Sequence, residues 1–215
     1  MHLNSHFFKR NTVLVAQDLL GKFLVRKIGK NKLSGMIVET EAYVGPHDLA
    51  CHASKGKTDR TKVMFEPAGT WYVYMIYGMY YCLNIVTEAK NYPSAVLIRA
   101  LEPTNLIEFM VKNRNLVPSS QLSVPSRKKL STDHWALITL SDGPGKLCRA
   151  LRIDKKLNCT SAVSKDAKLY IEDRGVKISK AKIVKSKRIG VAYAGSWKDR
   201  KLRFYIKGNQ FVSQV

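Results

Sequence analysis

The chain has 215 residues and a formal net charge of +21, because 37 Lys and Arg side chains outnumber 16 Asp and Glu side chains. The length suits one large domain with a hydrophobic core, and no Gly/Ser-rich or Pro-rich linker divides it. So strong a positive charge exceeds what solubility requires and indicates a polyanionic partner, while four widely separated cysteines argue against a disulfide framework, a zinc ribbon or an iron–sulfur cluster.

The N-terminal part predicts a short helix followed by a β-hairpin. Its first ten residues show no secretory signal pattern, so we expect an intracellular protein, in the cytoplasm of a bacterium or the nucleus of a eukaryote. Asn11 is a suitable N-cap for an apolar-periodic helix over 12–20, and Gly21 is a suitable stop. Strands are predicted at 23–28 and 33–44, and the Gly-containing turn between them predicts antiparallel pairing.

The central part predicts a loop, two aromatic strands, a third strand and a helix. The loop covers 45–62, the first aromatic strand covers 72–77 and bends at Gly78, and an apolar strand covers 95–101. Thr104 is the expected N-cap of a helix over 106–111, and a surface loop is expected from Asn113 to Asp133.

The C-terminal part predicts one helix and three strands among many basic side chains. A Gly-Pro-Gly-Lys sequence opens the helix, which ends near Leu151 and could hold a phosphate at its start, although such helix entries are common without a ligand. The strands are expected at 168–172, 183–191 and 202–206. Basic residues crowd the last two and could form either a solvated face or a phosphate-binding surface: Lys180, Lys182, Lys185, Lys187, Arg188, Lys198, Arg200, Lys201, Arg203 and Lys207.

The most unusual segment lies between Pro67 and Thr87, which has no charged residue yet contains five tyrosines within ten positions. Three interpretations are open: a membrane-spanning helix, a buried strand with aromatic filling, or a surface that stacks on nucleobases. Tyr, Gly and Asn are unusual in a membrane helix, and the β-prone pattern favours a strand, a bend and a second strand. Strand parity places Tyr74 and Tyr77 on opposite sides.

A pair of carboxylates precedes this segment. On the predicted strand 33–44, parity places Glu39, Glu41 and Tyr43 on one face, so an acid stands beside an aromatic ring. Such a pair suits a pocket in which a base stacks while a carboxylate faces its sugar bond. The alternative is that Glu39 and Glu41 are exposed strand residues that pair with Lys and Arg.

Several motifs resemble one family, the alkyladenine (3-methyladenine) DNA glycosylases. They occur in the family's order along nearly the whole chain: MIVETEAYVGPHD at 36–48, HAS at 52–54, YVYMIYGMYYCLN at 72–84, LIRALEP at 97–103, GPGKLC at 143–148, RIGV at 188–191 and LRFY at 202–205. The resemblance implies an α+β fold: residues 1–215 would form a single DNA glycosylase domain with a curved antiparallel β-sheet core, surrounding helices and a protruding DNA-intercalating β-hairpin. It also implies a monomer that acts on double-stranded DNA containing damaged purines, without a membrane, metal or cofactor.

The resemblance implies a role for individual residues. Glu41 would be the catalytic carboxylate that activates water, and Arg99 would help to hold that water and the flipped nucleotide. The base-binding residues would be Tyr43, His52, Tyr74 and Asn84, with Tyr77 as the intercalating residue and Met79, Tyr80, Lys146 and Arg188 as further DNA contacts. The substrates would be the class of 3-methyladenine, 7-methylguanine, hypoxanthine and ethenoadenine.

Departures from the family pattern at Tyr80 and Tyr193, where other members carry His, put the lesion preference in doubt. Two other functions stay open from the residues alone. A metal-dependent nuclease could use clustered carboxylates, and a non-catalytic binder of single strands or RNA could use the aromatic strands alone. The nuclease ligands would be Glu39, Glu41, Asp48 and Asp59. A zinc deaminase is disfavoured, because its His-x-Glu and Pro-Cys-x-x-Cys sequences are absent.

Overall fold

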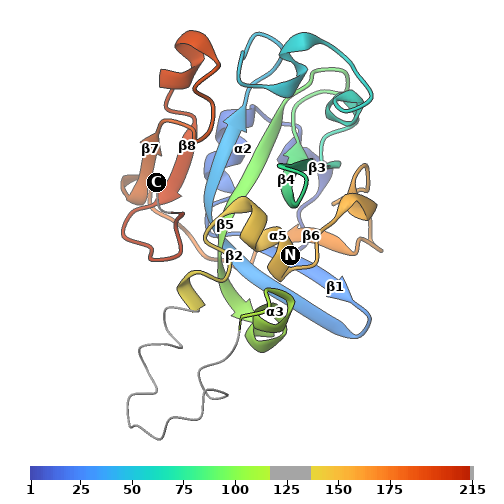
Figure 1. The fold of residues 1–215 in the computed structure, drawn as a ribbon, viewed down its shortest axis with the longest axis vertical. Coiled ribbons are helices and arrows are strands. Elements are labelled where there is room, and N and C mark those ends of the chain that lie inside the picture. The colour runs from blue at the N-terminus through green and yellow to red at the C-terminus, as the bar shows by residue number, and fades with distance from the viewer. Residues whose placement is uncertain (117–136, 214–215) are drawn as a thin grey trace, which may run out of the picture.

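An antiparallel sheet of eight strands forms the centre of the computed structural model, which describes residues 1–116 and 137–213. The order along the sheet is β3-β4-β5-β2-β1-β6, and β8 joins β2 to β7. Figure 1 shows these strands, whose bounds are β1 (Phe23–Ile28), β2 (Asn31–Tyr43), β3 (Trp71–Ile76), β4 (Tyr80–Val86), β5 (Ala95–Asn105), β6 (Leu169–Glu172), β7 (Ile183–Ser186) and β8 (Arg203–Ile206).

Two parts of the sheet, here called wings, are joined through the long strand β2. Its first half pairs with β1, with Met36 opposite Phe23, and its second half pairs with β8, with Thr40 opposite Phe204. Strand β5 runs along the other edge, and the pairing register shifts around Glu39. Irregularities of this kind bend a strand, so the wing formed by β7 and β8 turns away from the wing formed by β1 and β6 (Figure 1).

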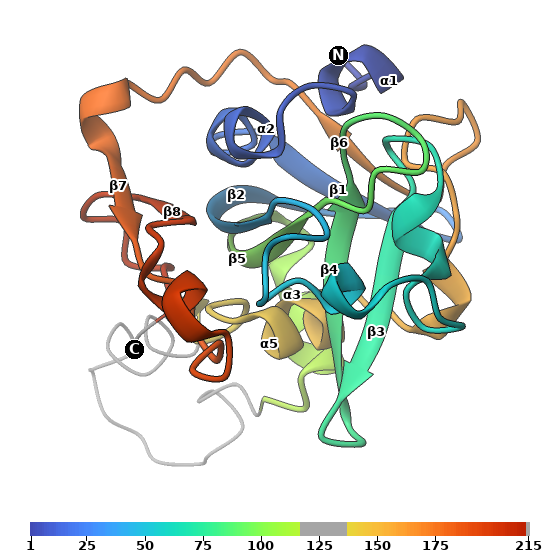
Figure 2. The same ribbon diagram turned by 90° about the horizontal axis from the view of Figure 1, so that it is seen from above.

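Helices cover both faces of the sheet (Figure 2). The α-helices are α1 (Ser5–Phe8), α2 (Thr12–Asp18), α3 (Ile107–Asn113) and α5 (Pro144–Ala150), and the 3-10 helices are η1 (His52–Lys55), η2 (Lys62–Phe65), η4 (Lys155–Leu157), η5 (Lys180–Lys182) and η6 (Gly195–Asp199). The side chain of Asn11 caps α2, as predicted, by accepting hydrogen bonds from the backbone N–H groups of Val13 and Leu14. Helix α2 packs on β2, where the Thr40 hydroxyl donates to the carbonyl of Ala16 over 2.8 Å, and α5 buries Leu147 and Cys148 on the opposite face.

The tyrosine-rich segment forms β3 and β4, so the membrane-helix interpretation is wrong. Among the residues that the structure describes, no helix has both the length and the apolar character needed to cross a membrane. The two strands form a hairpin that projects from the body of the protein (Figure 2).

The turn of this hairpin carries backbone strain. Tyr77 and Gly78 have φ angles of 51° and 68°, and the N–H of Met79 donates to the carbonyl of Ile76 over 3.2 Å. Two consecutive positive φ angles are typical of the type I′ turn, which usually carries Asn-Gly. For a Tyr this conformation costs about 1–2 kcal/mol. Tyr77 therefore lies beyond the end of β3, and the turn rather than strand parity sets its direction.

Two element predictions are wrong at their ends. Thr104 is not a helix cap, because β5 continues to Asn105 and the Thr104 hydroxyl instead donates to the carbonyl of Ser34. Strand β7 ends at Ser186 rather than at 191, because the chain turns there and buries the side chain of Arg188. Most of the expected loop from Asn113 to Asp133 lies outside the described residues.

Candidate active site

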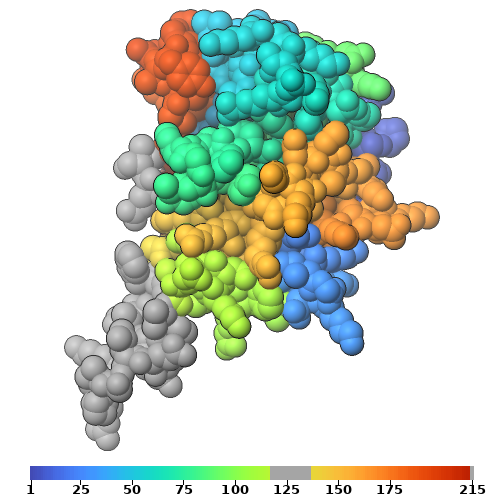
Figure 3. Space-filling model, turned by 45° about the vertical axis from the view of Figure 1, so that its right-hand side comes forward, coloured from blue at the N-terminus to red at the C-terminus, as the bar shows by residue number. Residues whose placement is uncertain are grey.

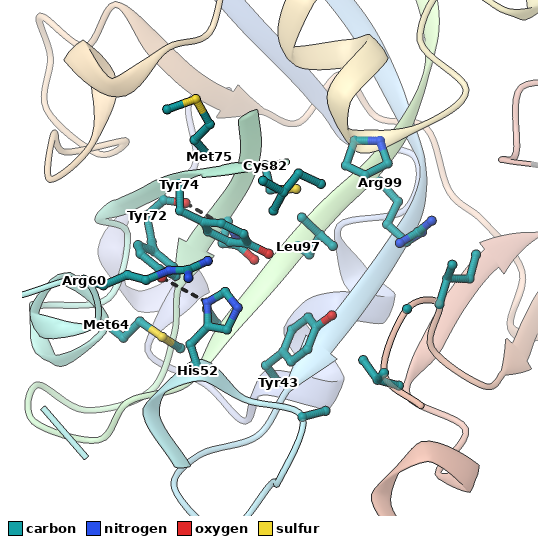
Figure 4. A pocket seen from close by; sticks show the side chains of 18 of the residues that line it. Tyr43, His52, Arg60, Met64, Tyr72, Tyr74, Met75, Cys82, Leu97 and Arg99 are labelled. Carbon is teal, nitrogen blue, oxygen red and sulfur yellow. Dashed lines mark hydrogen bonds between the residues drawn. The ribbon is translucent and has the colours of Figure 1, made fainter. Parts of the chain in front are cut away.

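A cavity of about 490 Å³ lies between the β3–β4 hairpin, strand β5 and the segment that precedes η6. Figure 4 shows Tyr72 and Tyr74 entering it from β3 and Tyr43 entering it from β2. Of the site residues predicted from the sequence, six contribute to its lining: Tyr43, His52, Tyr74, Tyr77, Asn84 and Arg99. The structure therefore brings together residues that are separated by as many as 56 positions in the chain.

One wall of the cavity is an aromatic cluster of His52, Tyr72 and Tyr74. The His52 and Tyr74 ring centroids are 4.6 Å apart in an edge-to-face arrangement, and those of Tyr72 and Tyr74 are 5.1 Å apart. Nδ1 of His52 is 3.0 Å from the hydroxyl of Tyr72 (Figure 4). Burial, and then the positive charge of Arg60, lower the pKa of His52 to about 4, so its ring is neutral at physiological pH.

The rings of His52 and Tyr74 are in contact, so this wall has no gap between them into which a base could insert. A base stacked between two rings needs about 7 Å between their planes, which is twice the usual contact distance. Since the two centroids are only 4.6 Å apart, a base cannot enter between them unless one ring moves. Asn84 lies in the same lining, where its amide group donates to the carbonyl of Tyr72 over 3.2 Å.

The carboxylate of Glu41 lies directly behind the cavity wall. Its side chain is 0% exposed, and although Glu41 does not itself line the cavity, three lining residues contact its two oxygens. Oε1 accepts from the N–H of Ile189 over 2.8 Å and is 3.2 Å from Nη1 of Arg99, and Oε2 accepts from the hydroxyl of Tyr43 over 3.0 Å. Burial and then the charge of Glu41 raise the pKa of Tyr43 well above its ordinary value, so its hydroxyl remains a donor.

Glu39 is equally buried but has a different set of partners. Its Oε1 is 2.9 Å from Nε of Arg99 and 2.6 Å from Nε of Arg203, and the backbone N–H and hydroxyl of Ser213 donate to the carboxylate over 2.8 and 2.9 Å. The expectation that Glu39 and Glu41 are exposed strand residues is therefore wrong. Glu39 is saturated with donors and contacts one lining residue, Arg99, whereas Glu41 contacts three.

Arg99 joins the two carboxylates. Its Nε contacts Glu39 and its Nη1 contacts Glu41. Burial acts to lower the pKa of Arg99, but Glu41 and then Glu39 outweigh this effect and raise it above the ordinary value. Arg99 therefore stays charged and holds Glu41 in position against the cavity.

Arg188 does not lie where a DNA contact requires it. Its side chain is closed to solvent, and its guanidinium group makes two contacts of 2.5 and 2.8 Å with the buried carboxylate of Asp48. It also donates to the carbonyl of Ala42 and lies 4.8 Å above the Tyr43 ring. This geometry does not support direct phosphate binding and instead fixes the backbone and ring of β2 beside the cavity. Arg203, another member of the basic C-terminal group, is also internal.

The other predicted DNA contacts lie at the surface. Tyr77 is 85% exposed and Met79 67% exposed at the hairpin tip, and Tyr80 follows them with partial exposure. Lys146 is half-exposed, with its ammonium group 2.8 Å from the carboxylate of Asp142. The second oxygen of Asp142 accepts from the same ammonium group over 3.0 Å, and the Asp142 side chain is only 10% exposed.

The sequence did not identify several residues that shape the cavity. The guanidinium carbon of Arg60 lies 5.1 Å from the centroid of the Tyr74 ring (Figure 4). Met64, Cys82 and Leu97 supply apolar lining. Their types are common in cores, so no sequence signal separated them from ordinary packing residues; only Arg60 could have been suspected, from its charge within the loop 45–62.

The carboxylates required by a nuclease do not converge. The carboxylates of Glu39 and Asp48 are already paired with arginine side chains. The side chain of Asp59 is fully exposed and pairs with Lys62. Within residues 1–116 and 137–213, no group of three or more His, Cys, Asp or Glu side chains is arranged to hold a metal ion.

Comparisons with known proteins agree with one another. The family described as methylpurine-DNA glycosylase matches residues 6–210. A protein of Legionella pneumophila (strain Lens) named "Putative 3-methyladenine DNA glycosylase" is 48% identical over 210 residues, which cover 97% of this chain and 96% of that protein. A protein of the same name from Clostridium perfringens (strain 13 / Type A) is 46% identical over 215 residues and covers 100% of both chains. Another from Methanocella arvoryzae is 47% identical over 208 residues, covering 97% of this chain and 94% of that protein.

Proposed function

This chain belongs to the methylpurine-DNA glycosylase family, and we propose that it removes damaged purines from duplex DNA by hydrolysing their N-glycosidic bonds, which initiates base excision repair. The substrates are 3-methyladenine, 7-methylguanine, hypoxanthine and ethenoadenine, and the protein acts as a monomer without a cofactor. The observation that carries the proposal is the buried Glu41 carboxylate, held by Arg99 and Tyr43 against the wall of an aromatic cavity.

The damaged nucleotide has to leave the duplex before it can react. Inside duplex DNA the glycosidic bond faces no protein group, so the nucleotide rotates out of the stack at a cost of a few kcal/mol, which is lowest for damaged or mispaired bases. The side chain of Tyr77, presented by a strained turn at the exposed hairpin tip, is suited to fill the gap. The extruded base then enters the cavity beside Tyr43, His52 and Tyr74.

Glu41 acts on the water that replaces the base. A carboxylate has about four acceptor positions, and the contacts with Ile189, Arg99 and Tyr43 occupy three of them. The fourth is left for a water molecule that enters through the cavity wall, since the carboxylate itself is closed to solvent. As the C1′–N bond breaks, its electron pair goes to the purine, and positive charge develops on the sugar near the carboxylate. The water oxygen bonds to C1′, and its proton passes to Glu41.

The aromatic lining favours bases that carry a positive charge. An N-alkylated purine is cationic and is already a good leaving group, and cation–π attraction to Tyr rings contributes about 0.5–2 kcal/mol. Neutral lesions such as hypoxanthine or ethenoadenine would otherwise leave as anions, so they need protonation or hydrogen bonds at the purine edge instead. Asn84 lies in the lining and is suited to disfavour the exocyclic amine of guanine, and the positive charge of 7-methylguanine offsets this effect for the alkylated base.

Base release from defined lesions tests this function. The protein is incubated with duplexes that contain 7-methylguanine, hypoxanthine or ethenoadenine, and alkali then cleaves the strand wherever a base has been lost. Strand breaks at the lesion, together with the free base in a mass spectrum, are the expected result. Binding to intact single strands with no base released from any of these lesions would refute the proposal and favour a non-catalytic binder.

A further inference from the structure

A second cavity, of about 480 Å³, lies on the other side of the β3–β4 hairpin from the candidate active site. The first cavity is lined by Met75, Ile76 and Tyr77 on the β3 side of the turn, and the second by Met79, Tyr80 and Tyr81 on the β4 side. The second cavity is closed by α5 and the segment that leads to η4, which lie directly below the hairpin in the space-filling view (Figure 3). The exposed tip of the hairpin therefore lies between the two cavities.

The second cavity has a positively charged rim. Arg149 and Arg152 line it, both are exposed, and neither guanidinium group forms a hydrogen bond or ion pair with any described residue. Arg114 lies close by, where burial and then the charge of Arg149 lower its pKa, and its buried Nε has no partner among the described residues. Guanidinium groups that repel one another without a paired acid leave donors free for an anion.

Arg152 also occupies an unusual backbone position. Its φ angle is 50°, at the end of α5, where Gly or Asn is the usual residue. One acid, Asp154, lies in the same cavity, but one of its oxygens accepts from the backbone N–H of Lys156, and Lys155 and Lys156 follow it at the surface. The balance of charge at this rim is therefore positive.

The arrangement matches the geometry of a duplex entered from its minor groove. That groove is only about 6 Å wide, so a hairpin tip inserted into it has one strand on each side. If the damaged nucleotide enters the first cavity, the backbone of the other strand passes along the Met79 side of the hairpin. The phosphates of that backbone are regularly spaced anions, and the unpaired guanidinium groups at the rim of the second cavity are suited to bind them.

We propose that Arg149 and Arg152 bind phosphates of the undamaged strand, opposite the extruded nucleotide. This inference rests on the proposed function and extends it. The two arginines hold the duplex against the hairpin while Tyr77 fills the gap. They act on DNA binding, and they make no contact with the reacting atoms.

Salt-dependent binding of an abasic duplex tests the proposal. The wild-type protein and the Arg149→Ala/Arg152→Ala variant are titrated with a labelled duplex that carries a tetrahydrofuran abasic analogue, at 50–200 mM salt. Each lost phosphate contact reduces the slope of log K against log salt by about 0.9, so the slope falls by about 2. A fourfold rise in salt then weakens the variant about 16-fold less than the wild type.

A matched control removes the same charge elsewhere. Lys177→Ala/Lys180→Ala alters exposed lysines in the segment between β6 and β7, which lies on the side away from the hairpin (Figure 2). This variant keeps the wild-type slope if the arginines act locally. Equal slopes for the wild type and the arginine variant, or equal reductions in both variants, would overturn the proposal.

Neutral phosphates identify the strand. Methylphosphonates placed in the undamaged strand opposite the abasic site weaken wild-type binding but leave the arginine variant unchanged, whereas the same groups in the damaged strand weaken both proteins equally. The reverse pattern would place the arginines on the damaged strand and refute the inference. Base release by the wild type is measured separately, so a failure of the proposed activity is distinguishable from a failure of this contact.

Discussion

The hydroxyl group of Tyr43 lies 3.0 Å from Oε2 of Glu41 and donates a hydrogen bond to it. The two residues are neighbours on one face of β2, and this bond connects the aromatic lining of the cavity with the buried carboxylate. It leaves Oε2 oriented toward the cavity wall.

Glu41→Gln is expected to reduce base release by about 10²–10⁴-fold, the usual contribution of a positioned general base. The amide keeps the volume but cannot take a proton from water. Single-turnover release of hypoxanthine from a duplex measures the loss, and binding of the same duplex should stay within a few-fold of wild type. Full turnover by this variant would remove Glu41 from the mechanism.

Glu39→Gln is the matched control, because Glu39 is equally buried on the same strand. It leaves Arg203 without its charged partner, and breaking a buried ion pair costs about 3–5 kcal/mol. We expect a large fall in the free energy of unfolding, measured in urea, and a smaller loss of base release per folded molecule than in Glu41→Gln. A stable but inactive Glu39→Gln protein would contradict this division of roles.

Tyr77→Gly and Tyr77→Ala separate strain from function. Gly relieves the positive φ angle, a change of about 1–2 kcal/mol, whereas Ala keeps the strained conformation. Both lack the ring, so both are expected to release bases at least about tenfold more slowly, which corresponds to 1.4 kcal/mol of lost stacking compensation. Thermal unfolding should give a higher midpoint for the Gly variant than for the Ala variant. Wild-type release rates in either would refute the role of the ring as a wedge.

His52 makes the fold sensitive to acid. Its pKa is lowered to about 4 in the folded protein by burial and by Arg60, while the unfolded chain takes up the proton near pH 6.5. The unfolded state therefore binds more protons between these values, so stability is fully present above about pH 6.5 and falls as the pH decreases toward 4. Urea unfolding at pH 7.5 and 5.5 should show a greater loss for wild type than for His52→Gln. Equal losses would show that other groups cause the acid sensitivity.

The sequence predicted most of the elements because their signals are local. The bounds of β1 and the cap at Asn11 agree with the structure, since each depends on a few adjacent residues. The end of β7 was predicted wrongly because Ile189 and Val191 continue an apolar pattern. What ends the strand is a contact that is distant in sequence, the pairing of Arg188 with Asp48.

The candidate site was predictable only in part, for the same reason. Motifs identified Glu41, Tyr43 and Arg99, and the structure places them together. Charge alone could not separate the internal arginines from the exposed ones, so Arg188 was predicted as a DNA contact although it is buried. The closed packing of His52 against Tyr74 depends on ring orientation, which residue type does not specify.

The contacts of Ser213 with Glu39 have a practical consequence for work on this protein. Through Glu39 and Arg99, Ser213 near the carboxyl end of the described chain contributes to fixing the charges beside the Glu41 carboxylate. Trimming residues 210–213 would remove the two hydrogen bonds that Ser213 donates to the buried carboxylate of Glu39. Affinity handles are therefore better attached at the amino end, where the backbone of Met1 pairs with that of Asp173 just beyond β6.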